Sequence, residues 1–313
     1  MRSRRHRDKL RLMAHTTLID VASLRKSLPD CVVLDCRFDL NRPDAGRQAW
    51  LAGHIPGARY ADLNRDLSSP VTADSGRHPL PSPAALAEFF TSAGVGDANQ
   101  VVAYDEANGS FAARAWWLLN WLGHAQVAVL DGGLAAWIAG VGPLESGAPA
   151  VGASVPRRNA VAGRVTAQFR PDAVTSAAEV LRALGDPRRL LVDARAPERF
   201  AGLVEPLDPV AGHVPGAINH PFTANLDSRA QFLPAAELRR LWSERLAGRN
   251  PRDLIAMCGS GVTACHNLLA LSVAGMPGAR LYAGSWSEWI RDPGRPVARG
   301  EPADGAPTAG NPA

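Results

Sequence analysis

The chain carries one set of short motifs twice, and this repeat constrains its fold more than any other feature of the sequence. Four motifs recur in the same order, at a nearly constant offset of about 155 residues. They are an apolar run ending in Asp-x-Arg (32–37, 190–195), a Gly-His-hydrophobic-Pro-Gly turn (53–57, 212–216), a second apolar run (101–105, 254–258) and a Gly-to-Trp segment (132–137, 284–289). Because a repeat of this length indicates duplicated structural units, the 313 residues predict two copies of one domain.

Within each copy, short apolar runs alternate with longer helix-like segments. The expected helices span 22–28, 83–93 and 111–122 in the first copy and 177–184, 234–246 and 262–274 in the second. Strands that alternate with helices are typical of a parallel sheet covered on both faces. We therefore predict an α/β protein of two tandem domains, each a parallel sheet flanked by helices on both faces.

The domain boundaries follow from the repeat and from local composition. We expect the first domain at 14–140 and the second at 166–298. The stretch 141–165 is rich in Pro, Gly and Ala, which predicts a linker. Residues 1–12, with their cluster of basic side chains, and residues 300–313 have the composition of disordered tails.

Cys258 lies where the second apolar run of the second copy ends, directly before Gly259-Ser260-Gly261-Val262-Thr263. This layout places a thiol between the carboxyl end of a strand and the amino end of a helix. Backbone N–H groups in such a loop can turn inward and bind an anion, so we expect a nucleophilic cysteine. This interpretation requires that the loop amides face the sulfur and that solvent reaches it. A buried structural cysteine is the alternative, but it does not need two flanking glycines.

The first copy has Asp105 at the position of Cys258, and the segment after Asp105 lacks the glycine pattern. A carboxylate cannot carry a transferred sulfur or phosphate group as a thiolate can. We therefore predict one active domain, with the first domain supplying scaffold and one wall of the site.

Composition argues against several classes of function. Hydrophobic residues make up 46% of the chain and charged residues 20%, as in ordinary globular proteins. No stretch reaches the roughly 18 to 20 apolar residues of a membrane span, and no basic stripe with interleaved aromatics favours nucleic-acid binding. The four cysteines fit neither a disulfide framework nor a zinc site. We expect a reduced, cytoplasmic protein without nucleic-acid or membrane partners.

Taken together, these motifs resemble the tandem-domain rhodanese family from Thr17 to about Arg291. The loop of residues 258–263 is similar to the active-site loop of the family's 3-mercaptopyruvate sulfurtransferase branch, and the Gly-His turns and segment 284–289 also match. The resemblance implies two rhodanese-like domains and sulfurtransferase activity. By this resemblance, Cys258 takes sulfur from a small-molecule donor as a persulfide and passes it to cyanide, a thiol or thioredoxin, without a metal or organic cofactor.

The resemblance also bears on the donor. Relatives that use thiosulfate carry Arg and Lys just after the cysteine, whereas Gly259 and Ser260 are neutral here. The Ser260 hydroxyl suits the thiol and carbonyl of 3-mercaptopyruvate. In the mercaptopyruvate branch an arginine in the loop after Asp-x-Arg binds the substrate carboxylate, and Arg199 matches it. A second family arginine falls near residues 205–208, where this chain has none. We predict 3-mercaptopyruvate as the donor, with thiosulfate as the alternative.

His78, in the run Gly-Arg-His-Pro, matches a first-domain histidine that the family has near the site, and Asp66 matches its acidic companion. The resemblance implies a proton relay of Ser260, His78 and Asp66. A histidine that merely packs against the linker is the alternative for His78. His54, His213 and the Asp-x-Arg pairs recur in both copies, including the copy without a thiol, and we therefore predict structural roles for them.

Two rival functions can be compared with this pattern. A dual-specificity phosphatase would need an arginine six residues after the cysteine to hold phosphate, and position 264 is alanine. A non-catalytic sulfur carrier or redox-sensing module is the second rival, because Asp105 shows that the fold tolerates loss of the thiol. The intact glycines around Ser260 favour catalysis.

Overall fold

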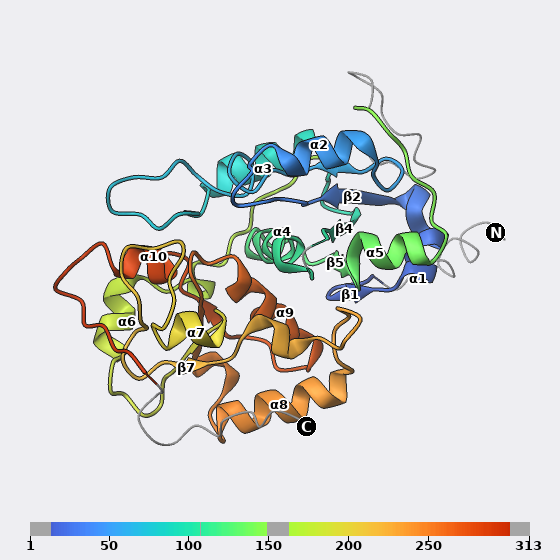
Figure 1. Ribbon diagram of the computed structural model, residues 1–313. Coiled ribbons are helices and arrows are strands. Elements are labelled where there is room, and N and C mark those ends of the chain that lie inside the picture. Colours follow the sequence, from blue (N-terminus) through green and yellow to red (C-terminus); the bar gives the residue numbers. More distant parts are fainter. Residues whose placement is uncertain (1–13, 107, 149–162, 301–313) are drawn as a thin grey trace.

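The computed structural model describes residues 14–106, 108–148 and 163–300, which form two α/β domains (Figure 1). The first domain holds a five-stranded parallel sheet with the order β1-β5-β4-β2-β3. Its strands are β1 (Leu18–Ile19), β2 (Cys31–Asp35), β3 (Arg59–Tyr60), β4 (Gln100–Tyr104) and β5 (Val127–Leu130). Its α-helices are α1 (Val21–Ser27), α2 (Ala45–Ala52), α3 (Pro83–Ser92), α4 (Ser110–Trp121) and α5 (Gly133–Ala139).

The second domain repeats this plan with a four-stranded parallel sheet, in the order β7-β6-β8-β9. Its strands are β6 (Leu190–Asp193), β7 (Ile218–Asn219), β8 (Leu254–Met257) and β9 (Arg280–Leu281). Its α-helices are α6 (Ala177–Ala183), α7 (Pro197–Phe200), α8 (Ala235–Leu246), α9 (Thr263–Val273) and α10 (Ser285–Trp289). Short 3₁₀ helices span Leu28–Asp30, Pro171–Ala173, Phe222–Asn225 and Pro251–Asp253. The predicted fold class, two tandem α/β domains with parallel sheets, is confirmed.

Each sheet has an inner side and an outer side, because successive strand residues point to opposite faces. In β2, Val32 and Leu34 face the inner side, and Cys31 and Val33 face the outer side. Strand β8 alternates in the same way. The inner sides of both sheets contribute to one continuous hydrophobic cluster, whereas each outer side has a cluster of its own.

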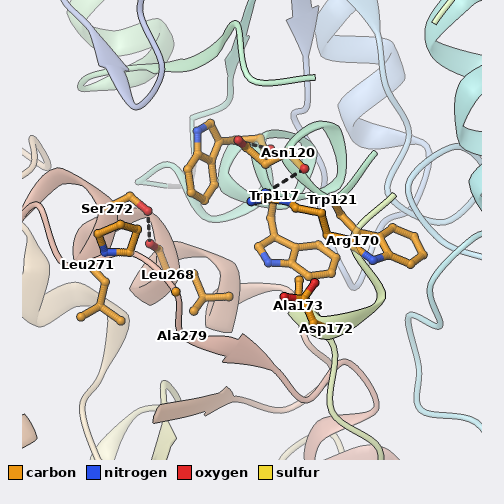
Figure 2. A pocket seen from close by; sticks show the side chains of 13 residues that line it. Trp117, Asn120, Trp121, Arg170, Asp172, Ala173, Leu268, Leu271, Ser272 and Ala279 are labelled. Atoms are coloured by element: carbon orange, nitrogen blue, oxygen red, sulfur yellow. Dashed lines mark hydrogen bonds between the residues drawn. The ribbon is translucent and has the colours of Figure 1, made fainter. Parts of the chain in front are cut away.

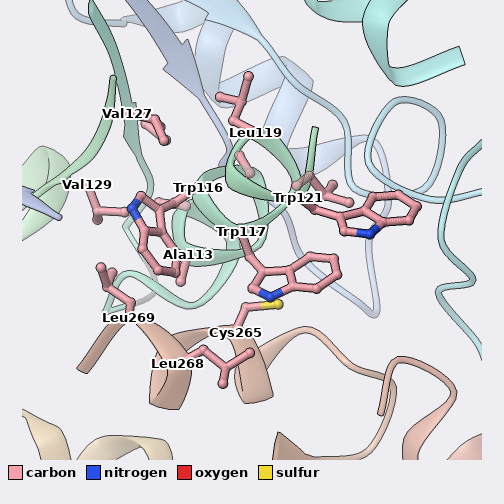
Figure 3. Packing of buried hydrophobic residues seen from close by; sticks show 14 of the residues in the cluster. Ala113, Trp116, Trp117, Leu119, Trp121, Val127, Val129, Cys265, Leu268 and Leu269 are labelled. Atoms are coloured by element: carbon pink, nitrogen blue, oxygen red, sulfur yellow. The ribbon is translucent and has the colours of Figure 1, made fainter. Parts of the chain in front are cut away.

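Helices α4 and α9 pack against each other between the two sheets (Figures 1 and 3). Trp116, Trp117 and Trp121 of α4 share the inner cluster with Leu268 of α9. Because α9 begins shortly after Cys258, this packing brings the cysteine loop to the junction of the two domains.

The Asp-x-Arg motif forms the same buried ion pair in both domains. The partners are Asp35 and Arg37, at 2.6 Å, and Asp193 and Arg195, at 2.7 Å. Each arginine also donates to the carbonyl of the glycine before the repeated histidine, Gly53 or Gly212. The histidines that follow, His54 and His213, hydrogen-bond to backbone carbonyls 2.8 Å away. This is the structural role predicted for residues present in both copies.

Part of the expected linker packs on the first domain. The backbone of Glu145 pairs with that of His54, and the N–H of Gly147 donates to the Leu51 carbonyl. Residues 1–12 and 301–313, predicted as tails, and residues 149–162 of the predicted linker lie outside the described residues. Within the part of the chain that the structure describes, no helix is both long and apolar enough to cross a bilayer.

Candidate active site at the domain junction

The loop after β8 turns its backbone amides toward the sulfur of Cys258. The N–H of Gly261 lies 3.1 Å from Sγ, and the N–H of Ser260 lies 3.5 Å from it. The backbone N–H of Cys258 itself donates to Oγ of Ser285, at 3.0 Å, which ties the loop to the start of α10. Two N–H groups aimed at one sulfur can stabilise negative charge on that atom.

The two glycines of the loop meet different demands. Gly261 has φ +77°, a left-handed conformation, and a side chain there would collide with the carbonyl of Ala283. Gly259 instead leaves room for charged side chains. A Cβ atom on Gly259 would lie 3.1 Å from Nη2 of Arg77 and 3.6 Å from both Nη atoms of Arg199. The loop therefore needs Gly261 for its turn and Gly259 for the guanidinium groups above it.

The expectation that solvent reaches the sulfur is wrong for this conformation, in which Cys258 is only 2% exposed. The cover includes a loop of the first domain that docks on the second. The backbone N–H of Arg77 donates to Oγ of Ser287, and a side chain at Gly76 would clash with the carbonyl of Gly284. A donor must therefore displace groups that close the site.

The structure brings together two of the three residues of the predicted relay. Nδ1 of His78 lies 2.8 Å from Oγ of Ser260, in a buried contact across the domain junction. Burial, with the nearby guanidinium groups of Arg114 and Arg77, lowers the pKa of His78 to about 3. The imidazole is therefore neutral at physiological pH and can accept a proton only when one is generated beside it.

Asp66 does not join this pair. Its Oδ2 atom accepts from the backbone N–H of Asp62, at 2.8 Å, and within the described residues no hydrogen bond connects Asp66 to His78. The physical reason is local: the carboxylate closes its own turn and lines a separate cavity beside Tyr60 and Arg65. Burial raises the pKa of Asp66.

Arg199 reaches the site but is held by two carboxylates. Its Nη2 atom lies 2.6 Å from Glu205 and 3.4 Å from Asp208. Asp208 also accepts from Nη1 of Arg77, so one carboxylate bridges arginines from both domains. Glu205 contacts a third arginine, Arg195, at 3.3 Å.

A buried arginine of α4 connects the parts of the site. Arg114 is fully buried and donates to the carbonyls of Leu67, His78 and Gly261, at 3.1 to 3.4 Å. Among the described residues no carboxylate pairs with it. Burial lowers the pKa of Arg114, and Cys258 is close enough to interact with it electrostatically. This cation therefore joins the His78 loop to the cysteine loop and adds positive potential near the sulfur.

The equivalent loop in the first domain keeps its amides directed inward but fills the centre with its own side chain. Oδ1 of Asp105 accepts from Gly109, and Oδ2 accepts from Phe111 and Ala112, at 2.7 to 2.9 Å. The anion-binding geometry has survived in this copy, with a built-in carboxylate as the anion.

The site at Cys258 is distinct from the open cavity at the other end of the α4–α9 contact. That cavity, of about 200 Å³, is lined by Trp117, Trp121, Arg170 and Ser272 among others, and not by Cys258 (Figure 2). At the cysteine loop, the guanidinium groups of Arg77 and Arg199 lie next to Gly259, and Asp208 bridges these two arginines.

Sequence reasoning missed Arg77, Arg114 and Asp208. Arg77 precedes His78 in the sequence, and Arg114 is the one charged residue in the apolar helix α4. Both positions could have been identified from the sequence as candidate site residues. Asp208 lies where the resemblance led us to look for an arginine, and only the folded structure shows what it contacts.

A thiol held by backbone amides, at the carboxyl end of a parallel sheet and flanked by guanidinium groups, defines a class of enzyme that transfers a group through cysteine. The chain belongs to the rhodanese family: the model of the rhodanese-like domain matches residues 20–140 and 176–292. It is a sulfurtransferase of the 3-mercaptopyruvate or thiosulfate type, as its relatives indicate.

Three relatives illustrate the likeness. The chain is 53% identical over 279 residues to the "Probable 3-mercaptopyruvate sulfurtransferase" of Pseudomonas aeruginosa, covering 88% of this chain and 95% of that one. It is 41% identical over 287 residues to the "Putative thiosulfate sulfurtransferase SseB" of Mycobacterium tuberculosis, covering 91% and 96%. The crystal structure of the 3-mercaptopyruvate sulfurtransferase of Escherichia coli aligns with a TM-score of 0.72 and 34% identity, covering 87% of this chain and all of that one.

Proposed function

We propose that this protein transfers sulfur from 3-mercaptopyruvate to a thiophilic acceptor through a persulfide on Cys258. The observation that carries the proposal is the pair of N–H groups, from Ser260 and Gly261, directed at Sγ of Cys258. Fixed N–H donors at Sγ stabilise the thiolate that attacks the donor and that is released again when the outer sulfur leaves, without reorganisation.

The chemical step balances with the groups at hand. The thiolate of Cys258 attacks the donor sulfur, the carbon–sulfur bond breaks, and its electron pair leaves on the carbon of pyruvate enolate. The proton of the donor thiol passes to that carbon, so that pyruvate departs and Cys258 holds the persulfide. We assign the movement of this proton to the Ser260–His78 pair, whose neutral imidazole can take it up and return it.

The anionic end of the donor has matching charges. Arg77 and Arg199 lie beside Gly259, one residue from the reacting sulfur, and a forked guanidinium is well suited to a carboxylate. Thiosulfate is the second candidate donor, favoured by the name of the mycobacterial relative. We propose cyanide, small thiols or thioredoxin as acceptors, because each presents a nucleophile able to attack the outer sulfur.

The persulfide is tested by intact-protein mass spectrometry after incubation with 3-mercaptopyruvate. The wild-type protein and Cys31→Ala, which changes a buried thiol of the first domain, should each gain one sulfur atom and lose it on treatment with cyanide. Cys258→Ser should gain none. Sulfur loading of Cys258→Ser equal to that of the wild type would refute the assignment.

The donor is tested by steady-state kinetics of Arg199→Ala with both compounds. If Arg199 holds the donor carboxylate, its loss should raise KM for 3-mercaptopyruvate about tenfold or more, and raise KM for thiosulfate less. Equal effects on the two donors would count against this role of Arg199.

A further inference from the structure

Asp208 bridges two arginines that lie beside the reacting cysteine. Its two carboxylate oxygens contact one guanidinium each, from Arg77 of the first domain and Arg199 of the second. Both guanidinium groups lie beside Gly259, next to the reacting cysteine. The side chain of Asp208 is 4% exposed, whereas those of Arg77 and Arg199 are 24% and 18% exposed, so solvent reaches the arginines but hardly the carboxylate.

The charges around this place already balance. Arg77, Arg195 and Arg199 face the carboxylates of Asp193, Glu205 and Asp208, and each of these six groups contacts at least one group of opposite charge. An anionic donor that bound Arg77 and Arg199 without moving a carboxylate would add a negative charge beside arginines that are already paired, which is unfavourable. One of the three carboxylates must therefore move away from its arginine partners when the donor binds.

Asp208 is the carboxylate that can move, because Asp193 and Glu205 are held by more contacts. Asp193 is bound to Arg195 inside the repeated ion pair, and Glu205 contacts Arg195 and Arg199 as well as the backbone N–H groups of Leu207 and Asp208.

Asp208, by contrast, is held by guanidinium groups alone, one of them at 3.4 Å. It lies in a surface segment whose apolar side chains Leu203, Val204 and Leu207 are exposed, so an outward movement breaks little packing.

Resting on the proposed function, we propose that Asp208 is an internal counter-anion that fills the donor's anion site in the resting enzyme and is displaced by the donor. It is a specificity-determining residue: it admits compounds whose carboxylate or sulfonate can take over both arginines, and it keeps neutral thiols away from Cys258.

The test compares wild type with Asp208→Asn, which keeps the shape of the side chain and removes its charge. Calorimetry measures the binding of pyruvate and, in a separate titration, the binding of sulfate. Neither measurement depends on catalytic turnover. With the competing charge removed, Asp208→Asn should bind at least one of these anions about tenfold more tightly. It should also lower KM for the matching donor by a similar factor, with kcat changed by less than about twofold. Tighter binding of pyruvate alone identifies the carboxylate site, and tighter binding of sulfate alone identifies a sulfonate site.

The control is Asp186→Asn, which removes an Asp–Arg pair from the same domain before the amino end of β6, whereas Cys258 follows the carboxyl end of β8. It should leave both affinities unchanged. Asp208→Ser provides a second variant if the asparagine variant does not fold, as judged by its melting temperature.

The proposal is overturned if both variants bind pyruvate and sulfate as weakly as the wild type, or more weakly, since Asp208 would then serve to position the arginines. This outcome is separable from failure of the proposed function. A wild-type protein that turned over neither donor would refute sulfur transfer, and the anion-binding comparison would still decide the role of Asp208.

Discussion

At the scale of single residues, the two glycines of the cysteine loop serve separate purposes that substitution can separate. Gly261 permits the left-handed turn that aims the amides at the sulfur, and Gly259 leaves the space in which the guanidinium groups lie. The first purpose concerns backbone conformation and the second concerns the binding of an anion.

We predict that Gly261→Ala lowers the free energy of unfolding by about 1–3 kcal/mol, because a side chain is strained at positive φ and meets the carbonyl of Ala283. The distorted loop should also reduce kcat severely. Gly259→Ala should keep nearly all of the stability, because the atoms that a methyl group meets are the ends of flexible side chains, and should mainly raise KM. Denaturant unfolding and donor kinetics of both variants check this. A Gly261→Ala variant with normal kcat would contradict it.

At this scale the sequence was informative where a residue's role is local. Cys258 and its glycines could be identified because strand, loop and helix are consecutive in the chain. Asp66 was assigned by resemblance alone, and its carboxylate bonds within its own turn. Asp208 could not be predicted, because its partners come from positions 131 and nine residues away that only the folded chain brings together.

At the scale of elements, α4 and α9 decide how the site is assembled. Both helices follow the central strand of their sheet, and they pack face to face between the domains. Their predicted ranges lie within one residue of those in the structure, since apolar runs and glycines mark their ends. Their mutual contact was not predictable, because an apolar helix does not specify which other helix covers it.

We expect the contact between α4 and α9 to be necessary for catalysis, because Arg114 of α4 donates to the carbonyl of Gly261 in the cysteine loop. We predict that Arg114→Met lowers stability by roughly 2–4 kcal/mol, because three buried carbonyls lose their donor. It should also slow persulfide formation at temperatures where the variant is fully folded. Arg114→Lys keeps the charge but cannot reach all three carbonyls, so it should recover part of the rate.

Single-turnover sulfur loading, followed by mass spectrometry, measures this effect. Arg188→Met, which removes an exposed arginine, is the control and should behave like the wild type. Wild-type loading rates in folded Arg114→Met would show that the buried cation acts on the fold alone.

At the scale of the whole molecule, buried histidines set the response to acid. Burial lowers the pKa of His78 and His266 to about 3 and that of His220 to about 4. In the unfolded chain these side chains titrate near pH 6.5. At pH values between the folded-state and unfolded-state pKa of these histidines, the unfolded chain binds more protons than the folded protein. The free energy of unfolding therefore falls as the pH falls.

We therefore predict a melting temperature that decreases steadily from about pH 7 to about pH 5, with up to roughly 1.4 kcal/mol lost per pH unit for each such histidine below its unfolded pKa. His266→Gln should make the decrease shallower, whatever its effect at neutral pH. Thermal unfolding across this range measures both slopes. Equal melting temperatures at the two ends would contradict the prediction.

The duplicated architecture has one further consequence, which concerns stoichiometry. In the first domain the backbone amides that would face a reacting sulfur bind the carboxylate of Asp105 instead. The duplicated chain therefore has one site that can be loaded with sulfur. Incorporation of isotopically labelled sulfur should saturate at one equivalent per chain. The curve of loading against donor concentration for an isolated chain should be hyperbolic, without the sigmoidal form that two coupled sites could produce.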